Sequence, residues 1–195
     1  MSVSKIVAAA ASGVGGAGLD VDEVFSTHLY TGTGSAITVV NDVDLTEGGL
    51  VWIKGRNTTR SHYLFDTERG TSVGLTSGGT NANLSITNAV TAFNNNGFTL
   101  GTYDDVNAGD AGKTQVAWTF RKAPKFFDVV TYSGQNTDLA LSHNLGVAPG
   151  MVIVKRTDSD ADWYVWHRSL NQSENLSLNS TGDVGGNNFW TSSAP

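Results

Sequence analysis

The feature that most constrains this 195-residue chain is a duplication with a period of about 100 residues. The segment GLVWIK at 49–54 returns as GMVIVK at 150–155, and YLF at 63–65 returns as YVW at 164–166. Both returns have an offset of 101 residues, and an earlier segment around Tyr30 returns with an offset of 102. Because a unit of this length is near the usual size of a folding domain, the sequence predicts two related modules in tandem.

Residue patterns within each repeat indicate strands. Apolar and polar residues alternate over 25–30, and 50–54 is a short apolar run typical of a strand buried on both faces. A chain with 23 glycines and only 15% charged residues is poor material for surface helices. Further segments with strand character lie at 62–65, 84–87, 97–101 and 115–120. We expect an all-β protein built as an antiparallel, jelly-roll-like β-sandwich, with a turn of helix only at 88–94.

The repeat also predicts the division of the chain. The basic, proline-containing join RKAPK at 121–125 separates the two copies. We therefore expect a Gly/Ala-rich N-terminal arm at 1–20, a first β-sandwich module at 21–122 and a second module at 123–195.

The second module is predicted to be incomplete. The first module has apolar segments at 98–100 and 116–120, and adding the offset to these numbers passes Pro195. A sandwich without its last strands exposes apolar faces and unpaired backbone edges. Either the parent protein continues beyond this segment, or another chain supplies the missing strands; we favour the first, because donated strands are the rarer arrangement.

The N-terminal arm carries no charge from Ile6 to Leu19 and consists mostly of Ala and Gly. It is too short to span a bilayer and lacks the Leu-rich centre of a cleaved signal peptide. Its small side chains offer little apolar area for independent order. We expect a flexible or extended arm; the alternative is an arm that becomes ordered only on a neighbouring subunit.

Composition argues against several classes of function. The net charge is −6 with 12 Lys and Arg in all, which disfavours a nucleic-acid partner. There is no cysteine, hence no thiolate nucleophile or metal ligand, and the four histidines form no zinc motif. A phosphate loop of the Gly-x-x-x-x-Gly-Lys-Ser/Thr type is also missing from the sequence. We expect no enzyme activity and no cofactor.

Two groups of carboxylates are candidate sites. Asp158, Asp160 and Asp162 are candidate Ca²⁺ ligands, but an EF-hand would need Gly and Glu where Trp163 and Ser169 stand, and a solvated hairpin turn is the simpler interpretation.

Asp66 and Glu68 could form an acid/base pair for glycoside cleavage. Their duplicates are His167 and Ser169, so the module keeps its pattern without them. We expect instead a turn in which Asp66 or Glu68 pairs with Arg69.

Aromatic residues provide candidate contacts to a ligand or partner. Tyr164 and Trp166 repeat the positions of 63 and 65 and are expected in the core, which leaves Trp163, matched by His62, as the exposed ring. Trp190 is the third candidate. Exposed rings can stack on the apolar faces of sugars, although packing in the core or against a subunit is the commoner use.

Five phrases in the chain resemble repeat modules of tail-fibre and other virion appendage proteins of tailed phages, especially phages of marine cyanobacteria. They are GLVWIKGR at 49–56, HYLFDTERG at 62–70, NGFTLG at 96–101, VAWTFRK at 116–122 and the segment from SHNLG to PGMVIVKR at 142–156. Such modules are similar to lectin-like jelly-rolls of the concanavalin or laminin-G type, and the resemblance covers nearly everything after Gly18. The truncated second repeat departs from the family, and the matching phrases are structural, so no catalytic residue is implied.

The resemblance implies a structural virion protein, the N-terminal part of a tail fibre or similar appendage that attaches to other tail proteins and contributes to host adsorption. It also implies a virion location and a homo-oligomer such as a trimer, without membrane insertion. A carbohydrate-binding module that recognises a host surface glycan is the alternative, and a polysaccharide depolymerase is a weaker one.

Overall fold

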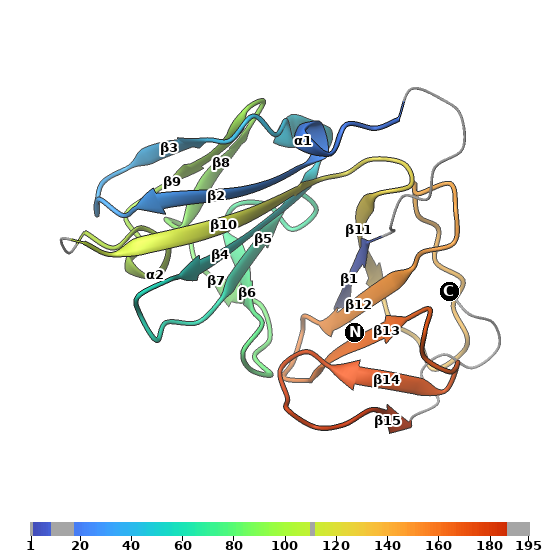
Figure 1. The fold of residues 1–195 in the computed structure, drawn as a ribbon. Helices are drawn as coiled ribbons and strands as arrows, with labels where there is room; N and C mark the ends of the chain where they lie inside the picture. The colour runs from blue at the N-terminus through green and yellow to red at the C-terminus, as the bar shows by residue number, and fades with distance from the viewer. Residues whose placement is uncertain (1, 9–17, 110–111, 187–195) are drawn as a thin grey trace. The chain divides into compact units, whose positions relative to one another are not determined.

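The computed structural model describes residues 2–8, 18–109 and 112–186. These residues form antiparallel sheets with a few single helical turns, so the expected all-β fold is confirmed. The chain separates into two compact units, shown in Figure 1. The first unit contains the described parts of 13–77 and 83–122, and the second contains those of 1–12, 78–82 and 123–195.

The first unit is a sandwich of a six-stranded and a three-stranded sheet. The six-stranded sheet has the order β2 (Phe25–Thr31), β10 (Thr114–Arg121), β4 (Gly49–Gly55), β5 (Tyr63–Asp66), β6 (Val73–Thr76) and β7 (Leu84–Ser85). The three-stranded sheet has the order β3 (Ile37–Val40), β9 (Gly97–Leu100) and β8 (Val90–Asn94). Short helical turns lie at α1 (Val21–Val24), η1 (Leu45–Glu47) and α2 (Asp104–Asn107).

The core of this unit includes residues from both sheets. In β4, Val51 and Ile53 belong to the core cluster, together with Phe65 of β5 and Phe98 of β9. Successive side chains of a strand point to opposite faces, so Trp52 lies on the other face of the sheet. The prediction that this strand is buried on both faces holds at Leu50, which is 1% exposed, but not at Trp52 and Lys54, which are only partly buried.

The expected helical turn at 88–94 was wrong. Residues Val90–Asn94 form β8, which pairs with β9 across the turn Asn95-Asn96. A short Asn-rich connection between two apolar runs is typical of a hairpin, and its local turn chemistry outweighed the helical signal.

The second unit contains one six-stranded sheet among its described residues. Its order is β11 (Phe127–Ser133), β1 (Ser2–Ala8), β12 (Met151–Arg156), β13 (Trp163–His167), β14 (Glu174–Ser177) and β15 (Gly185–Gly186). Figure 1 shows β1, in dark blue, between strands drawn in yellow and orange. The expected N-terminal arm is thus extended over Ser2–Ala8, but as an interior strand of a sheet.

Across 2–8, 18–109 and 112–186, no helix is long and apolar enough to cross a membrane.

Candidate functional site

Three rings gather on the outer face of the six-stranded sheet of the first unit. Trp118 of β10 and Trp52 of β4 are direct partners across the strands, so they lie on the same face. His62 stands one residue before β5 and joins them. All three side chains are partly exposed, and they lie on the face opposite to the core residues of β4.

The rings are in mutual contact. His62 stacks on Trp118 with centroids 6.3 Å apart and an interplanar angle of 8°. Trp52 lies edge-on to His62 at 5.9 Å and to Trp118 at 6.1 Å. These separations lie in the range favoured by aromatic pairs. We refer to Trp52, His62 and Trp118 as the aromatic cluster.

A hydrogen bond and the local electrostatics set the state of His62. Trp52 Nε1 donates to His62 Nδ1 at 3.0 Å, so Nδ1 is the unprotonated nitrogen and Nε2 carries the proton. Burial, and after it the nearby Lys54 ammonium, lowers the pKa of His62. The cluster is therefore an uncharged aromatic surface at neutral pH, suited to stacking against an apolar face.

The structure places the three predicted contact residues in different environments or leaves them undescribed. His62 belongs to the aromatic cluster, and Trp190 lies outside the described residues. The prediction that Trp163 is an exposed ring was wrong, because its exposed fraction is 0%.

Burial of Trp163 accompanies burial of its neighbour across the strands. Trp163 pairs with Lys155 of β12, whose exposed fraction is 1% and whose Nζ donates to the carbonyl of Thr80 at 3.1 Å. The segment 78–82 joins the second unit at this place, and Thr80 O also accepts from the backbone nitrogen of Ala161. Comparison of the two copies matched Trp163 to the partly exposed His62 and could not show this added segment.

The candidate Ca²⁺ ligands go to separate partners. Asp158 Oδ1 accepts from Arg156 Nε at 2.7 Å, Asp160 Oδ1 accepts from the backbone nitrogen of Ala82 at 3.0 Å, and Asp162 Oδ1 accepts from Asn179 Nδ2 at 2.8 Å. Within the part of the chain that the structure describes, no group of three or more His, Asp or Glu could hold a metal ion. Asp160 and Asp162 thus bind the turn to distant segments of the chain, whereas Asp158 pairs with a residue next to the turn.

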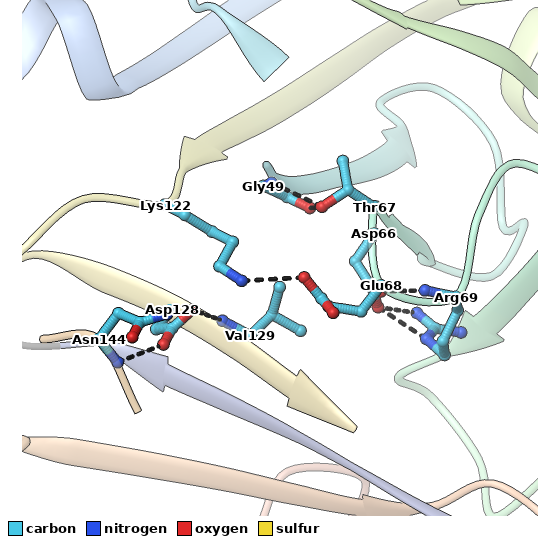
Figure 2. Close-up of polar contacts among 9 residues, drawn as sticks. All are labelled: Gly49, Asp66, Thr67, Glu68, Arg69, Lys122, Asp128, Val129 and Asn144. Atoms are coloured by element: carbon cyan, nitrogen blue, oxygen red, sulfur yellow. Dashed lines mark hydrogen bonds and ion pairs between the residues drawn. The ribbon is translucent and has the colours of Figure 1, made fainter. Parts of the chain in front are cut away.

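Asp66 and Glu68 are likewise engaged in separate ion pairs, as Figure 2 shows. Asp66 is fully buried and accepts from the backbone nitrogen of Arg69 at 2.9 Å and from its Nε at 2.6 Å. Glu68 Oε1 accepts from Lys122 Nζ at 2.9 Å. The predicted pairing of Asp66 with Arg69 is confirmed, and the pair holds the turn after β5.

Sequence reasoning missed Trp52 and Trp118 as site residues, although it placed both in strands. A signal was present, because both occupy positions that alternate with core residues. The missing information was the pairing of β4 with β10, two strands that lie about 60 residues apart in the chain.

Comparison with known proteins gives a family without an assigned function. A family model described as "Domain of unknown function (DUF7483)" matches residues 20–195. No curated protein and no solved structure matches the sequence.

Proposed function

The chain belongs to the DUF7483 family of domains of unknown function, and we propose that it is a structural, non-enzymatic component of a phage virion, the N-terminal part of a tail fibre or similar appendage. The observation that carries the proposal is what the two copies share. Apolar strand positions recur at the offset of 101, whereas Asp66 and Glu68 are replaced by His167 and Ser169. Because the strand positions recur between the copies and these carboxylates do not, the duplicated feature is the sheet structure, which favours a structural role over catalysis.

Two further points support this proposal. The phrases at 49–56 and 142–156 resemble modules of phage appendage proteins, and the carboxylates of Asp66 and Glu68 form ion pairs within the unit. In the proposed mechanism, tandem sheet modules act as a spacer, and several copies in one appendage convert weak host contacts into avidity. The N-terminal residues and the first unit contact other tail proteins, and the appendage is a homo-oligomer, with a trimer as the expected symmetry.

Purified particles provide the test. The phage that encodes the chain is banded on a density gradient, and the protein content of the band is measured by quantitative mass spectrometry. The proposal requires this chain at a fixed ratio to the major tail proteins, and immunogold labels on the tail. Recovery of the chain only in the soluble fraction of the lysate would overturn it.

The aromatic cluster favours a second candidate function, binding of a host surface glycan. Stacked, partly exposed Trp118 and His62 present flat apolar surface of the kind that packs against sugar rings, and the Nε2–H of His62 is a hydrogen-bond donor.

Titration with host lipopolysaccharide tests this second function. Binding is followed by tryptophan fluorescence and by sugar NMR, with Trp118→Ala as the test variant and Leu29→Ala, an exposed position on the neighbouring strand β2, as the control. Loss of binding in Trp118→Ala alone supports the site. No binding by the unaltered chain at millimolar sugar excludes it.

A further inference from the structure

One strand of the second unit comes from the opposite end of the chain. In the first unit, β10 lies between β2 and β4. In the second unit, the strands at the repeat positions of β2 and β4 are β11 and β12, and β1 lies between them. The N-terminal strand therefore holds the place that β10 holds in the first unit.

The register of β1 is that of β10 as well. Thr31 pairs with Thr114 in the first sheet, and its repeat counterpart Ser133 pairs with Ser2 in the second. On the other side of β10, Phe120 pairs with Leu50 of β4. Met151 of β12, the repeat counterpart of Leu50, pairs with Ala8 of β1. A slip of one residue would turn every side chain of a strand to the other face, so agreement on both sides indicates a site with a defined register.

This site is needed to hold the sheet together. β11 is joined to the other strands of its sheet through β1, so both β11 and β12 have unpaired backbone edges when β1 is withdrawn. An extended segment that adds main-chain hydrogen bonds to two exposed edges is a known mode of peptide recognition.

The sequence that follows β1 is rich in small residues. Residues 9–18 read AAASGVGGAG, with four glycines, no charge and no side chain larger than valine. The match to the family begins at residue 20, so β1 lies outside the region that defines the domain. When a second copy supplies the same strand to the same site, each backbone pair is remade, which is the low-cost basis of strand exchange.

We propose that the space between β11 and β12 is a strand-acceptor site, and that it takes the N-terminal strand of a second copy of this chain as well as that of its own. Exchange of β1 then links two copies through the same backbone hydrogen bonds that β1 makes within one chain. The proposed exchange does not depend on the virion function, because its observations are the strand order, the register, the composition of 9–18 and the start of the family match at residue 20.

The chain has no cysteine, which allows a direct test by disulfide trapping. Two register pairs are used, Lys5 with Val130 and Ser4 with Thr131. Neighbouring antiparallel pairs alternate between the wide and the narrow type, so one of the two is the closer pair, and both spacings suit a disulfide. Four single-cysteine full-length variants are made, K5C, V130C, S4C and T131C.

The variants are mixed in pairs at high concentration, partly unfolded and refolded together, and then oxidised. Matched mixtures are K5C with V130C and S4C with T131C, and mismatched mixtures made of the same four variants are the control. The double variant K5C/V130C reports the strand of the same chain. Products are separated by non-reducing electrophoresis and identified by mass spectrometry.

The proposal predicts disulfide-linked heterodimers several-fold more abundant in the matched than in the mismatched mixtures, and an intrachain disulfide in the double variant. An intrachain disulfide without heterodimers would overturn exchange and make β1 a fixed closing strand. Equal cross-linking in matched and mismatched mixtures, or no cross-link in any variant, would overturn the acceptor site itself.

Discussion

At the scale of single residues, the ion pair after β5 is buried while its neighbour is not. The side chains of Asp66 and Arg69 have exposed fractions of 0% and 5%, whereas those of Glu68 and Lys122 have 36% and 20%. Breaking a buried pair leaves an unpaired charge and costs about 3 kcal/mol or more, whereas a surface pair contributes under about 1 kcal/mol.

Asp66→Asn is therefore expected to lower the free energy of unfolding of the first unit by about 3 kcal/mol. Glu68→Gln is the matched control, with an expected loss under about 1 kcal/mol. Urea unfolding followed by tryptophan fluorescence measures both. Equal losses in the two variants would contradict the assignment of the buried pair.

Lys155 makes a contribution to stability that depends on pH. Its Nζ is buried beside the carbonyls of Thr80 and Arg156, and burial lowers its pKa from the ordinary value of 10.5, although Asp160 and Asp162 partly oppose the shift. Between the lowered pKa and 10.5 the unfolded chain binds more protons than the folded one. Stability attributable to this residue consequently rises with pH across that window.

The comparison that isolates Lys155 is with Lys155→Met. Raising the pH from 7 toward 10 is expected to stabilise the unaltered chain relative to the variant, by no more than about 1.4 kcal/mol per pH unit. Unfolding curves at four pH values measure the difference. A difference that stays constant or falls with pH would contradict a lowered pKa.

At the scale of elements, the β8–β9 hairpin depends on Gly97. Its φ is +142°, a backbone region that side chains rarely adopt, and a Cβ there would collide with the carbonyl of Val39. Gly70 also has a positive φ, +81°, but has open space around it.

Gly97→Ala should therefore destabilise the first unit by at least about 2 kcal/mol, and Gly70→Ala by about 1 kcal/mol, because the second substitution carries only the backbone strain. Thermal unfolding by calorimetry ranks the two. A smaller loss for Gly97→Ala than for Gly70→Ala would contradict the close approach of β3 to the turn.

At this scale the sequence predicts the strands that show a pattern between neighbouring residues. Alternation in β2 and the apolar run of β4 identified strands, because the period of side chains in a strand is local information. The aromatic cluster depends on the pairing of the distant strands β4 and β10, and the burial of Lys155 beside Trp163 involves the distant segment 78–82. A pattern between neighbouring residues contains no information on such long-range pairings, so the sequence did not predict them.

At the scale of the whole molecule, the sequence predicts that the second copy needs further strands, but it does not indicate that one of them comes from the N-terminus. We expected a continuation of the parent protein or another chain, and the structure places Ser2–Ala8 of the same chain in the sheet. Its seven residues carry no strong strand signal, and their partners lie more than 110 residues away. The register shared with β10 could be recognised only once the sheet was known.

The most direct test of this account is hydrogen–deuterium exchange on the full-length chain and on Lys5→Pro. Proline within an interior strand removes a ladder hydrogen bond, so β1 should leave the sheet. Backbone protection in β11 and β12 is expected to fall at least tenfold in the variant, while β4 and β10 of the first unit keep theirs. Unchanged protection in β11 and β12 would contradict the position of β1 as the strand that joins them.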